Sequence, residues 1–278
     1  MTSPGLKELG GPFALLKKVL VISRATLASQ FAYVGEQVVR TTFLVLILYI
    51  FTQLWNATDR FQDVREATGF SIPQLIWYLA FTESIIMSAA GIRGTSVDHD
   101  VRTGDLAYRL TKPIPYPCFQ FGSDLGTRVF RFFLNLAVGI GVSLAVVGPI
   151  PLAPLAVLAA ISLTLLVFVV DWIWVFSISV LSFWIEDTFG IHLLYRRLLM
   201  LLGGMLLPLE AYPDWLRSVC ERLPFAYMVY HPSRLFVLDR PDGFLHAVGV
   251  VLILGIVGLI PALLLYRLGL RQVSAQGG

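Results

Sequence analysis

Several apolar segments in the chain are longer than those in the core of a typical soluble domain. The longest covers residues 155–184, which exceeds the ~20 residues that a helix needs to cross a bilayer. Charged residues make up 14% of the chain, against about 25% in typical soluble domains, and the mean hydropathy is +0.76. Because helices satisfy their backbone hydrogen bonds internally in lipid, we predict an all-α integral membrane protein.

The apolar segments predict six membrane-spanning helices. They cover residues 38–55, 73–92, 121–147, 155–184, 198–209 (entered through residues 186–197) and 246–266. The pair Gly203 and Gly204 lies inside the fifth span. This pair is compatible with a contact between subunits, with a kink, or with tight packing inside one subunit.

A basic amphipathic segment precedes the first span. Within residues 13–34, apolar residues recur at helical spacing and basic residues lie off that stripe: Phe13, Leu16, Leu20, Leu27 and Phe31 against Lys17, Lys18 and Arg24. This pattern suits a helix on the anionic inner surface of a membrane. We favour that interpretation over an ordinary helix leading into the first span.

The distribution of Lys and Arg predicts the orientation. With the N-terminus inside, 15 of these residues face the cytoplasm and 6 face outward, which accounts for all 21. Both termini are therefore predicted to be cytoplasmic. The chain then forms one transmembrane domain, with a tail and interfacial helix (1–36), a six-span bundle (37–268) and a second tail (269–278).

Several function classes lack their signatures. The sequence contains no GxxxxGK[ST] phosphate loop, no GxSxG and no HExxH, and its four His show no metal-ligand spacing. A net charge of +3 is too small to indicate a nucleic-acid partner. The predicted topology puts Cys118 and Cys220 on opposite sides of the membrane, so we expect no disulfide between them.

The longest polar stretch between two spans covers residues 93–120. Gly104 divides a charged first part from a shorter second part, and three prolines at 113, 115 and 117 then stiffen an extended segment. A short helix on such a strut can transmit a push to the third span. The alternative is a solvated loop, and composition alone does not decide between them.

The residues after the second span resemble a pattern of ABC type-2 exporter permeases, in particular a six-span subgroup. The pattern is an acidic residue, Gly, Leu-Ala, Leu and Lys-Pro at fixed spacing, here Asp100, Gly104, Leu106, Ala107, Leu110, Lys112 and Pro113. The segment before the last span is also similar, although its motif is less specific, with Pro208, Tyr212, Pro213, Trp215, Pro224 and Phe225.

The resemblance implies a permease subunit of an ATP-driven exporter in a bacterial inner membrane. Two permeases, identical or related, would sit on two separate ATPase subunits. It favours a related second chain, which would make the complex a heterodimer of permeases. ATP and Mg²⁺ would bind to the ATPases, and this chain would need no cofactor or metal and would not be an enzyme by itself.

The resemblance also implies roles for two segments. The stretch 93–120 would include the coupling helix, with partner contacts at Asp98, Asp100, Arg102, Gly104, Asp105, Leu106 and Arg109. The outer segment 208–243 would form re-entrant helices that gate the exit; the alternative is a surface loop on the lipid headgroups. The substrate is not indicated, and the direction of transport rests on the resemblance alone.

Four charged residues fall inside predicted spans: Glu83, Arg128, Arg131 and Asp171. Charged side chains in a membrane are costly and either line a path or find partners. We favour pairing of Glu83 or Asp171 with one of the arginines. The rival function is a self-sufficient secondary transporter that uses Glu83 or Asp171 as a proton site. A membrane enzyme or scaffold would need a polar cluster at one face, which the sequence does not show.

Overall fold

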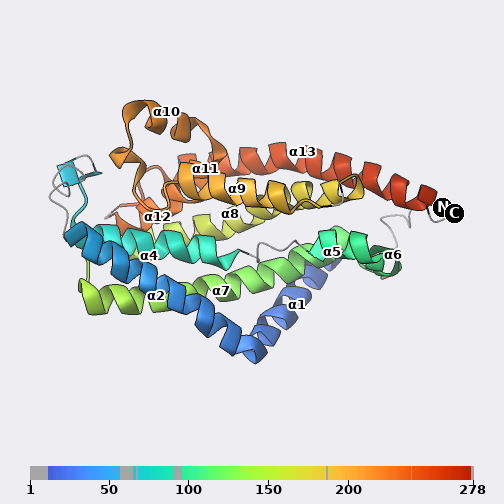
Figure 1. Cartoon of the computed structure of the whole chain (residues 1–278), viewed down its shortest axis with the longest axis horizontal. Helices are drawn as coiled ribbons and strands as arrows, with labels where there is room; N and C mark the ends of the chain where they lie inside the picture. The colour runs from blue at the N-terminus through green and yellow to red at the C-terminus, as the bar shows by residue number, and fades with distance from the viewer. Residues whose placement is uncertain are drawn as a thin grey trace.

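A bundle of long helices forms the protein, as Figure 1 shows. The computed structural model describes residues 12–56, 65–66, 68–89, 96–185, 187–238 and 240–276. Within these ranges the ordered elements are helices, and no β-strand occurs. The prediction of an all-α protein is therefore confirmed.

Four helices in the described part of the chain are long and apolar enough to cross a membrane. These helices are α2 (Val34–Asn56), α7 (Tyr116–Val146), α8 (Pro154–Val180) and α13 (Phe244–Gln276). Their candidate spans are Gln37–Trp55, Tyr116–Val146, Pro154–Phe183 and Phe244–Arg271. The first, third, fourth and sixth predicted spans fall on these helices.

Shorter helices complete the bundle. Helix α4 (Ile72–Ser88) covers most of the second predicted span, whereas α9 (Phe189–Leu202) overlaps the fifth predicted span, 198–209, only as far as Leu202. The fifth helix therefore lies earlier in the chain than predicted, because Gly203 and Gly204 end it. The others are α1 (Pro12–Gln30), η1 (Phe31–Tyr33), α5 (Ser96–Thr103), α6 (Asp105–Leu110), η2 (Leu181–Phe183), η3 (Leu209–Ala211), α10 (Asp214–Arg222), α11 (Pro224–Met228) and α12 (Tyr230–Val237). Between the first two predicted spans, residues 57–64 and 67 lie outside the described part. So do residues 90–92 of the second predicted span and residues 93–95 of the central polar stretch.

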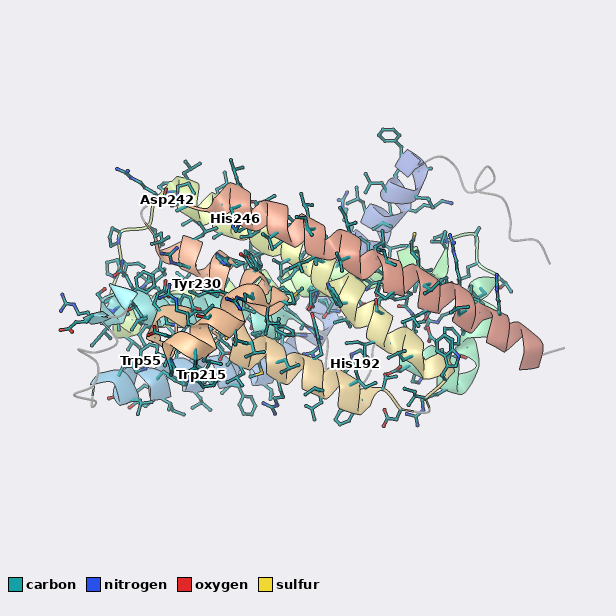
Figure 2. The ribbon with its side chains drawn as sticks, turned by 90° about the horizontal axis from the view of Figure 1, so that it is seen from above. Trp55, His192, Trp215, Tyr230, Asp242 and His246 are labelled. Carbon is teal, nitrogen blue, oxygen red and sulfur yellow. The ribbon has the colours of Figure 1, made fainter. Side chains whose placement is uncertain are left out.

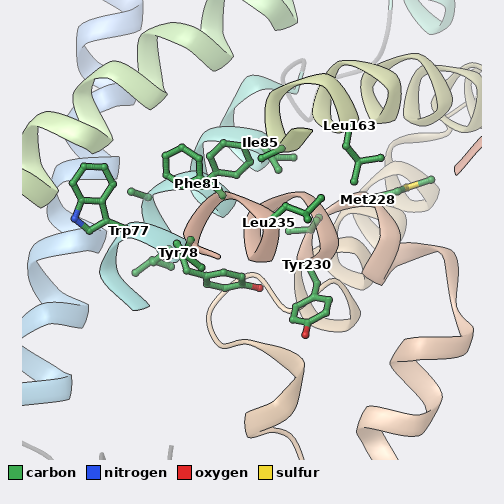
Figure 3. Packing of buried hydrophobic residues seen from close by; sticks show 14 of the residues in the cluster. Trp77, Tyr78, Phe81, Ile85, Leu163, Met228, Tyr230 and Leu235 are labelled. Atoms are coloured by element: carbon green, nitrogen blue, oxygen red, sulfur yellow. The ribbon is translucent and has the colours of Figure 1, made fainter. Parts of the chain in front are cut away.

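Helix α4 is buried along most of its length. It begins with a capping box, in which the Ser71 hydroxyl accepts from the Gln74 backbone and the Gln74 side chain accepts from the Ser71 backbone. Phe81, in the middle of α4, stacks on Phe236 of α12 with 4.4 Å between the ring centroids. It also meets Phe132 of α7 edge to face with 5.6 Å between the ring centroids. Figure 3 shows this core between α4 and its neighbours. Aromatic pairs of this geometry help to fix the packing of helices.

The outer surface of the bundle is apolar. On α13, Ile256 and Ile260 are each 66% exposed, and on α8 Leu158 is 64% exposed. Exposed apolar surface on this scale indicates contact with lipid or another protein. Together with the four candidate spans, it indicates that the protein is embedded in a membrane.

Helix α1 packs closely on the first half of α7. Gly122 and Gly126 of α7 face α1, where a Cβ on Gly126 would come within 3.0 Å of the Ser23 Cα. The Ser23 hydroxyl donates to the Gly122 carbonyl at 2.8 Å. Small residues at a helix crossing allow the two backbones to approach, so these glycines position α1.

The two ends of the bundle differ. Helices α5 and α6 lie at the end where α13 finishes, whereas α10 and α12 lie at the opposite end (Figure 1). The Lys18 ammonium of α1 donates to the Pro113 carbonyl at 3.2 Å, which links α1 to the segment after α6. The central polar stretch and the outer segment of the sequence therefore occupy opposite ends of the molecule.

Candidate functional site

The central polar stretch folds into two short helices with a sharp bend between them. Helix α5 ends at Thr103, and Gly104 adopts a left-handed backbone conformation with φ +79° before α6 begins at Asp105. Glycine suits this conformation because it has no Cβ to clash. The bend turns one side of both helices toward the bundle and leaves the other side exposed.

Asp100 anchors the end of α5 to α7. Its side chain is 1% exposed and its Oδ2 accepts from the Tyr116 hydroxyl at 2.8 Å and from the Gln120 amide at 3.0 Å. The Arg109 Nε of α6 lies 3.0 Å from the same oxygen. A buried carboxylate with several donors and a cation is well compensated. Asp100 therefore joins α5, α6 and α7.

Asp98 makes a second anchor, two residues earlier on α5. It accepts a hydrogen bond from the Thr188 hydroxyl, directly before α9, and lies 4.0 Å from the His192 Nε2. His192 in turn lies 3.1 Å from the Ser179 hydroxyl near the end of α8. These contacts connect α5 with the junction of α8 and α9.

Other side chains of the same two helices are free to meet solvent or a partner. Arg102, Gly104 and Asp105 are exposed, and Tyr108 is 68% exposed. The Lys112 ammonium lies 5.1 Å from the centre of the Tyr108 ring, within the range of a cation–π contact. This exposed side of α5 and α6, formed by Arg102, Gly104, Asp105 and Tyr108, is called the docking face below.

The seven residues predicted to contact a partner thus fall into two groups. Arg102, Gly104 and Asp105 lie on the docking face. The others face the bundle wholly or in part: Asp98, Asp100, Leu106 and Arg109. Contact of Asp98, Asp100 and Leu106 with a partner would require opening their present packing, so they act first as anchors.

Sequence reasoning missed several members of this site. Tyr108 was not singled out, and neither were the donors Tyr116 and Gln120. The last two stand four residues apart, which places them on one side of a helix; that spacing was the available signal for a buried acceptor. Thr188 carried no such signal because its partner Asp98 is distant in sequence.

A cluster of possible metal ligands also lies here. Ligand atoms of His99, Asp100 and Asp105 lie within 4.8 Å of one another. Arg109 already neutralises Asp100, and the other two residues are exposed. The arrangement therefore fits the stabilisation of the two helices, and nothing else about it points to a metal.

Arg128 and Asp171 are paired with each other. Arg128 of α7 forms an ion pair and hydrogen bond with Asp171 of α8, and its other terminal nitrogen donates to the Phe168 carbonyl at 3.2 Å. The Tyr195 hydroxyl of α9 donates to the second oxygen of Asp171. These contacts give Arg128 and Asp171 the structural pairing that was one of two alternatives for them. They also join α7, α8 and α9.

Glu83 and Arg131 do not take part in this ion pair. Glu83 is 2% exposed in the middle of α4, and its Oε1 has no hydrogen-bond partner among the residues that the structure describes. Arg131 is half-buried on α7. A further acid, Asp124, was not predicted as a site residue, yet its carboxylate accepts from the Trp172 indole at 3.0 Å.

The turn that follows α9, directly before the outer segment, packs against α4 at the other end of the bundle. The hydroxyl of Tyr78 donates to the Gly204 carbonyl at 2.5 Å, and that of Thr82 donates to the Met205 carbonyl at 2.9 Å. Gly204 has φ +67°, and a Cβ on Gly203 would lie 3.1 Å from the Val229 Cβ. The glycine pair therefore ends α9 and permits tight packing within this chain.

The predicted gate residues take several environments. Pro208 is buried, and the Tyr212 hydroxyl donates to the Leu201 carbonyl at 2.9 Å. Phe225 packs at the edge of the core and Pro224 begins α11. Pro213 is exposed beside Trp215, which is 70% exposed; Figure 2 shows Trp215 and Tyr230 toward one end and His192 toward the other.

Polar contacts also order the outer segment. Glu210 accepts from the Tyr230 hydroxyl, and its Oε1 lies 3.1 Å from the Arg234 Nε. On α10, Arg217 donates to Glu221 at 2.7 Å, and this hydrogen bond raises the pKa of the Arg217 guanidinium. The second pair is solvent-exposed, so it contributes little to stability.

Comparison with known proteins bears on identity. No curated protein matches the sequence. A family model described as "ABC-2 family transporter protein" matches residues 39–277. The match covers the four candidate spans, except for the first two residues of the first, together with the docking face and the outer segment. The chain belongs to the ABC-2 transporter family and is a membrane permease of that family, not itself catalytic.

Proposed function

We propose that the chain is the permease subunit of an ATP-driven exporter, in which two permeases stand on two ATPase subunits. ATP and Mg²⁺ bind in the ATPases, and the permease carries no cofactor. The observation that supports this proposal most is the docking face. It is polar and exposed at one end of the bundle, yet it is held rigidly by the buried anchors Asp98 and Asp100.

The anchors suggest how a push is transmitted. Asp100 ties α5 to α7 through Tyr116 and Gln120, and Asp98 ties α5 to the α8–α9 junction through Thr188. A displacement of α5 by an ATPase is thus delivered to three helices at once. Packed helices joined by short polar contacts move as rigid bodies rather than deform.

We assign six spans by adding α4 and α9 to the four candidate spans. Helix α4 has 17 residues and α9 has 14, which correspond to about 25 and about 21 Å of helix. The distribution of Lys and Arg then supports cytoplasmic termini in a bacterial inner membrane. In this proposal the chain is a single transmembrane domain, in which residues 37–268 form the bundle, residues 1–36 hold a tail and the interfacial helix, and residues 269–278 form a second tail.

Helix α1 fits the role of an interfacial helix. One side of α1 packs on α7. On the exposed side, Phe13, Leu16 and Leu20 are 86%, 57% and 54% exposed. Apolar side chains on the outside of a basic helix suit insertion into the headgroup region. Lipid would cover this stripe in the membrane.

The outer segment fits the role of an exit gate. Its short helices α10 and α12 lie at the end opposite the docking face, and Phe236 of α12 stacks on Phe81 of the central helix α4. Movement of α4 would thus reach the outer end. The second permease is proposed to be a related chain or a second copy.

Co-purification tests the proposal. The tagged permease is extracted from its own host in mild detergent, and co-purifying proteins are identified by mass spectrometry. We expect an ATPase that is lost on the double substitution Arg102→Glu and Asp105→Lys. The matched control is Arg217→Glu on α10, which changes an exposed charge at the opposite end and should leave the ATPase bound.

A permease that elutes alone, while other membrane complexes stay whole, would overturn the exporter assignment. Family membership does not favour the rival secondary transporter. That rival predicts uphill transport by the purified chain without an ATPase, and loss of it on Glu83→Gln.

A further inference from the structure

A pocket of about 290 Å³ lies between α2 and α7, away from both the docking face and the outer segment. One wall comes from the first half of α2 and the other from the middle of α7. The lining residues used below are Gln37, Thr41, Thr42, Val45, Leu134 and Val138.

Gln37 gives the pocket its chemistry. The residue is 3% exposed, and its amide Nε2 has no hydrogen-bond partner among the residues described. The neighbouring hydroxyls donate elsewhere, Thr41 to the Gln37 carbonyl at 2.8 Å and Thr42 to the Val38 carbonyl at 3.0 Å. A buried N–H without an acceptor is destabilising. Gln37 lines the pocket while its Nε2 atom is covered, so a ligand that brings an acceptor favours a rotation of the amide toward the pocket.

The surroundings restrict what else the ligand can be. Val38, Val45 and Leu134 line the pocket. Val38 is 58% exposed, and Phe133, the neighbour of Leu134 in the chain, is 43% exposed. A ligand must therefore be apolar along its length and carry an acceptor at one point. The volume is at the lower limit of sites for drug-sized molecules, about 300–1,000 Å³, which suits one hydrocarbon chain rather than a whole lipid.

We propose that this pocket binds one acyl chain of a membrane glycerophospholipid, whose ester carbonyl accepts a hydrogen bond from the Gln37 amide. Gln37 stands near the start of α2. The orientation proposed above puts that start at the inner edge of the hydrocarbon core, and lipid ester groups lie at that boundary. Which leaflet supplies the lipid depends on the proposed orientation, whereas the argument from the residues that line the pocket does not.

Photo-crosslinking tests the site. The permease with its ATPase is placed in nanodiscs that contain phosphatidylglycerol with a diazirine on the acyl chain, close to the ester. After illumination, adducts are mapped by mass spectrometry, and the adduct mass shows whether an entire phospholipid is attached. We expect adducts at Thr42, Val45 and Val138 above the level at the lipid-exposed Ile256 and Ile260 of α13.

Two variants address the mechanism of binding. Gln37→Leu removes the donor, and losing one neutral hydrogen bond of about 1 kcal/mol corresponds to about a fivefold loss of adducts. Val45→Phe fills the pocket from a position that is 37% exposed and should remove the adducts even if Gln37→Leu fails to fold. The matched control is Thr52→Val, a buried polar residue farther along α2 whose hydroxyl donates to the Leu48 carbonyl.

Adducts spread equally over the pocket and α13, or unchanged in both variants, would overturn the proposal. So would a protein–protein crosslink from this pocket to a second permease, which would make it a subunit contact. The amount of ATPase bound to the permease is measured separately in the same samples. Its loss would count against the exporter assignment, whereas its retention with no specific adducts would count against the lipid site alone.

Discussion

The ion pair between Arg128 and Asp171 joins two long helices in the apolar part of the bundle. Both side chains are nearly buried, with exposures of 9% and 6%. Removing ions from water is costly, and the pair must recover that cost through geometry and additional hydrogen bonds. The Phe168 carbonyl and the Tyr195 hydroxyl supply those bonds, so either charge alone would be poorly tolerated.

Asp171→Asn should therefore destabilise the protein by about 3–5 kcal/mol, because it leaves Arg128 buried without a counter-charge. The double variant Arg128→Met with Asp171→Leu should lose less, since neither charge remains. Thermal unfolding in detergent measures both. Arg217→Met is the control, because breaking its exposed pair with Glu221 should cost no more than about 1 kcal/mol. Equal losses in the single and double variants would contradict a structural pair.

The bend between α5 and α6 depends on Gly104. A Cβ at this position would meet no atom within 4 Å, so any penalty comes from the backbone conformation and not from crowding. Gly104→Ala should cost about 1–2 kcal/mol, the penalty of the left-handed conformation for an L-residue. It should also weaken ATPase binding by shifting Tyr108 relative to Arg102.

Gly141→Ala on α7 provides the matched control. Its Cβ would also meet nothing within 4 Å, and its φ is not positive. In a helix interior, this change should stabilise by up to about 1 kcal/mol. If unfolding measurements show the same sign for both alanines, the left-handed conformation of Gly104 is not maintained in the membrane.

The packing of α1 on α7 leads to a second prediction about helices. A Cβ at Gly126 would collide with the Ser23 backbone, which cannot move without the rest of α1. Gly126→Ala should therefore loosen α1, seen as faster amide hydrogen exchange across residues 12–30. Gly141→Ala, on the same helix but away from α1, should leave that exchange unchanged. Unaltered exchange in Gly126→Ala would contradict the close backbone approach.

Elements were easier to predict from the sequence than contacts. Long apolar segments such as 155–184 identify spans because bilayer thickness fixes their length. Boundaries shifted where polar residues continue a helix: α7 begins at Tyr116 rather than residue 121, and α13 continues to Gln276. Asp98 and Asp100 were recognised as important, yet their inward direction depends on Thr188 and Tyr116. Such partners are brought together only by the tertiary fold.

At the scale of the whole molecule, the two ends differ chemically, and the proposed orientation places them in different compartments. The docking face carries the charged side chains Arg102 and Asp105, and the outer segment carries the exposed Trp215 in the first turn of α10. Tryptophan prefers membrane–water interfaces. The two native cysteines are free thiols, Cys118 half-buried and Cys220 buried. Both are replaced before labelling so that they do not react. The orientation can therefore be tested by introducing single cysteines.

In a Cys118→Ser, Cys220→Ala background, Ser218→Cys on α10 should react with a membrane-impermeant maleimide in intact cells. Thr103→Cys on α5 should react only after the cells are opened, because the distribution of Lys and Arg puts α5 in the cytoplasm. Both positions are exposed, so accessibility differs only through the membrane. Ile256→Cys, on the apolar surface of α13, should stay unreactive in both conditions. The opposite pattern at Ser218 and Thr103 would invert the molecule and remove the docking face from any cytoplasmic ATPase.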